Sequence, residues 1–96
     1  MEEKLFFKLS RVIKSRKKSL PKDSYVTKLF KKGKIKIANK LGEEAVETIT
    51  AYLYEGKKEV LEESADLMFH LLVLLEDSNL TIEDVEKTLK RRMKND

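Results

Sequence analysis

Residues 40–77 read KLGEEAVETITAYLYEGKKEVLEESADLMFHLLVLLED, and this segment predicts a helical hairpin. Its apolar residues recur at intervals of three and four, which is the period of an amphipathic helix. We expect one helix from about Ile35 to Tyr54 and a second from about Lys58 to Asp77. The turn between them is Glu55-Gly56-Lys57, in which Gly56 is expected to cap the end of the first helix.

Two pairs of acidic residues lie within this hairpin at helical spacing. Glu44 and Glu47 are three positions apart, as are Glu63 and Asp66, and residues at this spacing lie side by side on a helix. The first pair precedes Gly56 by 12 and 9 positions, and the second follows it by 7 and 10. Antiparallel packing therefore brings both pairs to similar heights, where four bare carboxylates would repel one another unless a cation lay among them. The pattern predicts a metal site formed by Glu44, Glu47, Glu63 and Asp66.

Carboxylate oxygens without cysteine neighbours select hard cations, so Mg²⁺ is the expected metal, with Mn²⁺ as a substitute. Glu43 and Glu62 each precede a pair by one position, and the sequence leaves open whether each is an outer ligand, a general base or a spectator. His70 follows Asp66 by one helical turn. It either acts on the site, by orienting a carboxylate or contacting a phosphate, or is a hydrogen-bonded core residue.

The rest of the chain also predicts helices. The expected fold class is all-α, a small bundle of about five helices in a single domain over residues 1–96. Glycine occurs three times and proline once, and no segment competes as a strand. A first helix is expected from about Glu2 to Ser15. A short second helix, capped by Asp23 or Ser24, should run to Phe30.

The apolar surface of this bundle is expected to exceed what one chain can bury. A chain of 96 residues buries only somewhat more than about 60% of its unfolded surface. We therefore expect the bundle to be completed by dimerisation or by a higher homo-oligomer. The last helix should begin with a capping box formed by Thr81 and Asp84. The arc of the third helix that we expect to face the core consists of Ala38, Leu41, Ala45, Ile49, Tyr52 and Leu53.

The composition indicates a cytoplasmic protein without a membrane partner. There is no cysteine, so neither a disulfide framework nor a thiolate zinc site is present. The N-terminal segment carries too many lysines among its apolar positions to be a signal peptide. The longest unbroken apolar run, Leu71 to Leu75, is too short to span a bilayer.

The net charge of +4 conceals a strong asymmetry. Residues 1–40 hold 14 basic against 3 acidic residues, whereas residues 41–86 hold 2 against 13. The basic ends alone would suggest nucleic acid, but there is no aromatic platform or known motif, and the acidic middle opposes backbone binding. We expect a small polyanion instead. Its predicted phosphate clamp consists of Lys28, Lys34, Lys36 and Lys40.

These motifs resemble the phosphoribosyl-ATP pyrophosphatase family of histidine biosynthesis, a branch of the MazG-type all-α nucleotide pyrophosphohydrolases. The resemblance rests on K-x-G-E-E-A-x-E at residues 40–47 and E-x-A-D-L-x-x-H at residues 63–70. It extends over about residues 5 to 92. The superfamily's metal motif, E-x-x-E followed by E-x-x-D, coincides with the four carboxylates that the spacing selected. The smaller matches are Ser24-Tyr25, Gly33 and Lys36-Ile37.

The resemblance implies a MazG-like bundle that hydrolyses phosphoribosyl-ATP to phosphoribosyl-AMP and pyrophosphate, the second step of histidine biosynthesis. A Mg²⁺-activated water would attack the α–β phosphoanhydride, with Glu43, Glu44 and Glu47 as the catalytic glutamates. A separate phosphoribosyl-AMP cyclohydrolase is expected, because the chain is too short to hold a fused one. Two alternatives are a house-cleaning (deoxy)nucleoside triphosphate pyrophosphatase of the MazG type and a non-enzymatic helical module whose carboxylates are solvated surface.

Overall fold

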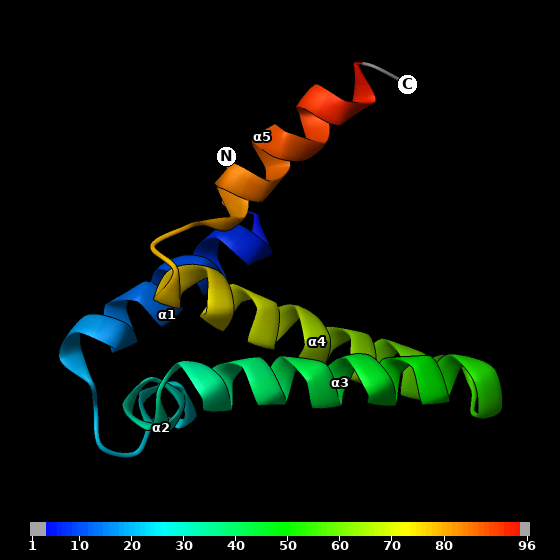
Figure 1. Ribbon diagram of the computed structural model, residues 1–96, viewed down its shortest axis with the longest axis horizontal. Helices are drawn as coiled ribbons and strands as arrows, with labels where there is room; N and C mark the ends of the chain where they lie inside the picture. Colours follow the sequence, from blue (N-terminus) through cyan, green and yellow to red (C-terminus); the bar gives the residue numbers. More distant parts are fainter. Residues whose placement is uncertain (1–3, 95–96) are drawn as a thin grey trace.

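Helices α3 (Lys34–Tyr54) and α4 (Lys57–Asp77) lie antiparallel and form the hairpin on which the other helices are arranged (Figure 1). The structure is a computed structural model that describes residues 4–94. Within this range all regular secondary structure is helical, so the predicted all-α class with five helices is confirmed. None of these helices is long and apolar enough to cross a membrane. Both hairpin helices begin one residue earlier than expected, which leaves only Glu55 and Gly56 between them.

Gly56 begins α4, and the prediction that it caps the end of α3 was wrong. Its φ of −132° is extended rather than left-handed. Its main-chain N–H donates to Glu59 Oε1 at 3.1 Å, within the first turn of α4. Glu55 ends α3 instead, and its N–H donates to the carbonyl of Ala51. Gly56 is the N-cap of α4, and its N–H is used by Glu59 of that helix. The end of α3 therefore contains no left-handed glycine.

Helix α1 (Leu5–Ser19) continues past Ser15, where its end was predicted, while the predicted start at Glu2 lies outside the described residues. The helix ends at Leu20, which has a left-handed φ of 49° and precedes Pro21. A residue before proline is disfavoured in the right-handed helical conformation. The proline therefore ends α1.

Helix α2 (Tyr25–Lys32) is capped by Ser24, whose Oγ accepts a main-chain N–H of the first turn at 3.3 Å. Of the two caps that the sequence left open, Asp23 is not used. The helix continues two residues beyond Phe30, and only Gly33 separates it from α3. Gly33 has a φ of 94°, which glycine adopts at little steric cost. The chain turns sharply there, and Figure 1 shows α2 crossing the start of α3.

Helix α5 (Ile82–Met93) extends away from the hairpin (Figure 1). It begins with the predicted capping box, which is confirmed. The N–H of Thr81 donates to Asp84 Oδ2 at 2.9 Å, and the N–H of Asp84 donates to Thr81 Oγ1 at 3.3 Å. Ile82 and Val85 pack against the core, but no residue of α5 is buried.

The hydrophobic core lies where α1 and α2 cover the N-terminal half of α3 and the C-terminal half of α4. Lys17 on α1 strengthens this end, because its Nζ donates to the main-chain carbonyl of Glu76 at 2.8 Å. The other end of the hairpin, around its turn, is not covered by any described helix (Figure 1). The buried apolar residues of the core are Ile13, Val26, Leu29, Ile37, Leu72, Val73 and Leu75.

The buried face of α3 differs from the predicted apolar arc. The buried residues are spaced seven apart, at Ile37, Glu44 and Ala51, and each is at most 7% exposed. Ile49 and Leu53, which belong to the predicted arc, are 57% and 58% exposed. The arc prediction was therefore wrong, because it assumed that a carboxylate would not occupy the centre of a packing face. In this chain Glu44 does so.

Candidate metal and phosphate site

Three carboxylates from α3 and α4 converge where the two helices pack together. One oxygen from each of Glu44, Glu63 and Asp66 lies within 4.8 Å of the other two. Glu44 is buried, Glu63 is half-buried and Asp66 is exposed, so the group opens toward solvent on one side. Oxygen ligands at this spacing suit a hard divalent cation. We call these three residues the carboxylate trio.

Glu47, the fourth predicted ligand, lies one turn after Glu44 with an exposed side chain. It is outside the trio, but its carboxyl group lies close enough to those of Glu63 and Glu44 to shift the pKa of both. The interaction with Glu47, followed by burial, raises the pKa of Glu63 to about 7. Burial, followed by the contact with Glu47, also raises the pKa of Glu44. Both shifts have the direction expected where acidic groups crowd together, because protonation removes part of their mutual repulsion.

Two oxygens of the trio, Glu44 Oε2 and Glu63 Oε2, are buried without a hydrogen-bond partner among residues 4–94. A buried polar atom that lacks a partner destabilises the fold. The surrounding ligand set consists of carboxylate oxygens, and the chain has no cysteine. The unpartnered oxygens and the donor set therefore fit Mg²⁺, with Mn²⁺ as a substitute.

Lys40 lies beside the trio on α3. Its Nζ is 3.3 Å from Glu43 Oε2 and 3.9 Å from Glu44 Oε1. The hydrogen bond to Glu43 is the main reason that the pKa of Lys40 is raised. Glu43 thus binds a lysine rather than joining the trio. Glu62, its counterpart on α4, is exposed and also lies outside the trio.

A cleft of about 230 Å³ adjoins the trio through Lys40 and lies between α2 and α3. We call it the lysine cleft. Lys34, which was predicted to bind phosphate, is the exposed first residue of α3 and does not line this cleft. Several cations around one cleft suit a phosphate chain. The cleft is lined by Tyr25, Lys28, Leu29, Lys32, Lys36 and Lys40.

Two lining residues, Tyr25 and Lys32, were not among the predicted site residues. The spacing of α2 contains the signal that would have found them. Tyr25, Lys28 and Lys32 stand three and four positions apart, so they share one face of that helix. Proximity to the acidic segment along the chain selected Lys34 instead, although it lies on the other side of the turn at Gly33.

His70 is buried and uses both ring nitrogens within the protein. Its Nδ1 lies 2.7 Å from the main-chain carbonyl oxygen of Asp66, and its Nε2 lies 2.9 Å from the hydroxyl of Tyr25. Burial is the largest of the effects that raise the pKa of Tyr25, so the phenol keeps its proton at neutral pH. The sequence left two roles open for His70, and its buried, doubly hydrogen-bonded ring fits the role of a core residue.

The fold and the site define an all-α protein in which a carboxylate trio that suits a divalent cation adjoins a lysine cleft that suits phosphate groups. Comparison with known proteins gives the family within this class. The phosphoribosyl-ATP pyrophosphohydrolase family model matches residues 6–93. The chain belongs to this family, as the sequence motifs predicted.

Individual relatives agree with this assignment. The chain is 48% identical over 86 residues to the phosphoribosyl-ATP pyrophosphatase of Metallosphaera sedula, covering 90% of this chain and 92% of that protein. It is 49% identical over 94 residues to the phosphoribosyl-ATP pyrophosphatase of Pyrobaculum aerophilum, covering 98% and 100%. It is 47% identical over 89 residues to the histidine biosynthesis bifunctional protein HisIE of Thermotoga maritima. That match covers 93% of this chain but only 45% of the bifunctional protein.

Proposed function

We propose that this protein hydrolyses phosphoribosyl-ATP at the α–β phosphoanhydride and releases phosphoribosyl-AMP and pyrophosphate. The observation that carries the proposal is the adjacency of two unpartnered carboxylate oxygens in the trio and the lysine cleft, with Lys40 in contact with both. Two further relatives, from Zymomonas mobilis and Sulfolobus acidocaldarius, are named phosphoribosyl-ATP pyrophosphatase at 48% and 44% identity. This agreement supports the choice of substrate.

In this proposal Glu44, Glu63 and Asp66 hold Mg²⁺, and the neighbouring Glu47 completes the set. When bound, Mg²⁺ neutralises the triphosphate and lowers the pKa of a water in the site. The protein contributes by holding these carboxylates in place before the substrate arrives. Glu44 is the most rigid of them, because it is fixed in the packing face of α3.

The lysine cleft binds the phosphate chain. Lys28 and Lys32 approach it from α2, while Lys36 and Lys40 approach it from α3. Their charges offset the repulsion between a triphosphate and the nearby acidic residues. Glu43 fixes Lys40 through their hydrogen bond, so Lys40 points toward the boundary between cleft and trio.

Of the three glutamates proposed as catalytic, Glu47 is the best placed to accept a proton from the attacking water. It is exposed, and it lies beside Glu63 at the edge of the trio. The oxygen of the water forms the new bond to phosphorus, and its proton passes to Glu47. The bond between that phosphorus and the bridging α–β oxygen breaks, and the bridging oxygen leaves with the other product. In the same scheme Glu43 contributes by orienting Lys40, and Glu44 contributes by holding Mg²⁺.

The decisive experiment offers phosphoribosyl-ATP and ordinary (deoxy)nucleoside triphosphates, each with Mg²⁺, and separates the products. We expect phosphoribosyl-AMP and pyrophosphate from the first substrate. Cleavage of the ordinary triphosphates alone would instead assign the chain to the house-cleaning branch. Replacement of Glu47 by Gln should lower metal affinity at least about tenfold and abolish most turnover while helix content is retained. Unchanged metal binding in this variant would favour a non-enzymatic module.

We also propose that two copies of the chain associate through the exposed apolar surface of the hairpin. Four residues lie on the side of α3 opposite Glu44, about 140° to 200° around the helix. They are between 57% and 78% exposed. A stripe on one helix face can pack against its own copy across a two-fold axis. This apolar stripe consists of Ile35, Val46, Ile49 and Leu53.

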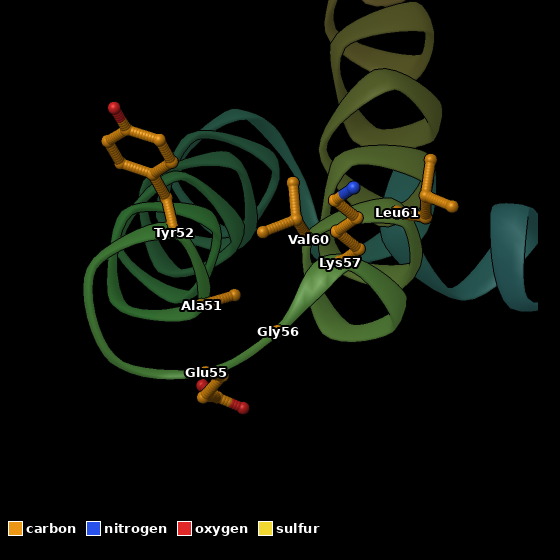
Figure 2. Close-up of a pocket in the computed structure, with 7 residues that line it drawn as sticks. All are labelled: Ala51, Tyr52, Glu55, Gly56, Lys57, Val60 and Leu61. Atoms are coloured by element: carbon orange, nitrogen blue, oxygen red, sulfur yellow. The ribbon is translucent and has the colours of Figure 1, made fainter.

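The turn of the hairpin supports the same proposal. Figure 2 shows Val60 between the two helices and the ring of Tyr52 pointing away from α4. Tyr52 and Leu61 are 77% and 72% exposed and border an open cleft of about 460 Å³. This cleft contains none of the trio, so we interpret it as part of the surface that a second copy covers rather than as a substrate site.

A further inference from the structure

The hydroxyl of Tyr25 connects the lysine cleft to the helix that carries two of the trio. Tyr25 is the first residue of α2, and its side chain lines the cleft. Its hydroxyl lies 2.9 Å from Nε2 of His70, which is only 6% exposed on α4. The ring of Tyr25 also stacks on that of Phe69, with 6.2 Å between the centroids. One side chain therefore spans from the phosphate-binding helix to the metal-binding helix.

The direction of each hydrogen bond follows from the chemistry of the groups. A carbonyl oxygen can only accept, so Nδ1 of His70 carries a hydrogen and donates it to the Asp66 carbonyl. In the neutral ring, Nε2 then has a lone pair and accepts from the Tyr25 hydroxyl. The bond to Asp66 lies within α4, one turn back, and it fixes the plane of the imidazole. The ring is thus a rigid acceptor at a set position, which suits it to anchor Tyr25.

The hydrogen bond between Tyr25 and His70 affects the positions of residues that the proposed reaction needs. Lys28 and Lys32 lie on the same face of α2 as Tyr25, and all three line the cleft. Asp66 lies one turn from His70 on α4. The distance between the phosphate clamp and the trio therefore depends on how α2 is held relative to α4, and a shift of about 1 Å in such an arrangement can change turnover considerably.

We propose that Tyr25 is a positioning residue whose hydroxyl, through His70, holds the lysines of α2 at the correct distance from the carboxylates of α4. The proposal rests on the proposed function only in that the cleft binds phosphate groups next to the trio. The hydroxyl of Tyr25 is hydrogen-bonded to His70 rather than to a carboxylate of the trio. Its removal should weaken the binding of phosphate chains and leave the binding of the cation unchanged.

The test compares Tyr25→Phe with Tyr54→Phe, which removes a hydroxyl from an 81% exposed tyrosine at the remote end of α3. Because Tyr25 is 45% exposed and its ring remains in the variant, loss of the hydroxyl opens no buried cavity. We expect Tyr25→Phe to raise the KM for phosphoribosyl-ATP about tenfold, with kcat changed less than about threefold. The Kd for Mg²⁺ alone, measured by calorimetry, should stay within about twofold. Tyr54→Phe should match the parent protein in all three quantities.

Two variants of His70 separate positioning from general stabilisation. His70→Gln keeps an acceptor where Nε2 stood, whereas His70→Asn reaches only toward the Asp66 carbonyl. We expect the Gln variant to retain most of the substrate affinity and the Asn variant to resemble Tyr25→Phe. The double variant Tyr25→Phe with His70→Asn should be no worse than either single one, because both remove the same bond.

Binding of inorganic pyrophosphate in the presence of Mg²⁺ provides a readout that does not depend on turnover. Tyr25→Phe should bind pyrophosphate about tenfold more weakly than the parent protein. If the parent binds pyrophosphate but does not cleave phosphoribosyl-ATP, the proposed function fails and this inference still stands on the binding data. An unchanged KM and pyrophosphate affinity in Tyr25→Phe, or an equal loss of Mg²⁺ affinity, would overturn the inference. The same holds if the parent protein does not bind pyrophosphate at all.

Discussion

The carboxyl groups of Glu47 on α3 and Glu63 on α4 lie close together, and their interaction is the main reason that the pKa of Glu63 is raised to about 7. Below that pKa, a proton on Glu63 replaces part of the positive charge that a cation would supply. A site that holds a proton when empty and releases it to a metal couples folding, pH and metal binding. The first two predictions follow from this coupling.

The stability of the metal-free protein should fall as pH rises toward neutrality. The pKa of Glu63 is about 7 in the folded chain and 4.5 in its reference state, so the folded state binds the proton more tightly. The stabilisation is therefore fully present below pH 4.5 and is lost as pH rises through about 7. Melting curves in a chelator should show a decreasing Tm across this range for the parent protein. Glu63→Gln should flatten that decrease, whereas Glu55→Gln, at the exposed hairpin turn, should keep it. A Tm of the parent protein that rises over the same pH range would contradict the raised pKa of Glu63.

Mg²⁺ binding should release a proton. Because the cation and the proton compete for the same carboxylates, the affinity for Mg²⁺ should fall by up to about tenfold per pH unit below about pH 7. Calorimetric titrations in buffers of different ionisation enthalpy count the protons released. We expect close to one proton per Mg²⁺ on the acid side of this pKa and fewer on the alkaline side. Mg²⁺ affinity that does not vary with pH would show that the cation binds elsewhere.

The lining of the lysine cleft predicts which lysine side chains bind the phosphate groups of the substrate. Lys32→Ala and Lys36→Ala should each raise the KM for phosphoribosyl-ATP about tenfold, because each removes a charge that lines the cleft. Lys34→Ala removes the same charge from the exposed start of α3 and should change the KM less than about twofold. The comparison is made by steady-state kinetics at constant ionic strength. An effect of Lys34→Ala as large as that of Lys32→Ala would mean that general attraction, rather than the cleft, binds the phosphates.

The sequence predicted which carboxylates lie side by side, but it did not predict which of them is buried between α3 and α4. Spacing of three places Glu44 beside Glu47 on any helix, and the short turn at Gly56 fixes the height of the partner pair. Whether Glu44 or Ile49 faces α4 depends on the rotation of α3 about its axis, and one residue corresponds to about 100°. That rotation is set by packing along the whole hairpin. The buried Glu44 was therefore recognised as a ligand candidate without being recognised as the centre of the packing face.

The sequence predicted the cleft residues on α3, but for a related reason it did not predict all of those on α2. Lys36 and Lys40 lie on the same helix as Glu44, so their proximity to the trio follows from helical spacing. Lys32 and Tyr25 belong to α2, and their approach depends on the backbone conformation at Gly33, whose φ of 94° determines how α2 crosses α3. A single pair of dihedral angles at one glycine is not encoded in any periodicity. The spacing of α2 places Tyr25, Lys28 and Lys32 on one face, but only the three-dimensional structure shows that this face lines the cleft.

Association of two copies can be tested on the apolar stripe. Sedimentation equilibrium of the parent protein should show a dimer or a higher oligomer at micromolar concentration. Ile49→Lys places a charge in the middle of the stripe, where it would be desolvated on association, and should weaken self-association at least about tenfold. Ser15→Lys adds the same charge to an exposed position on α1 and should leave the association unchanged. Circular dichroism should confirm that both variants keep their helix content. A parent protein that remains monomeric at these concentrations would show that Ile35, Val46 and Leu53 are exposed to solvent in the working molecule.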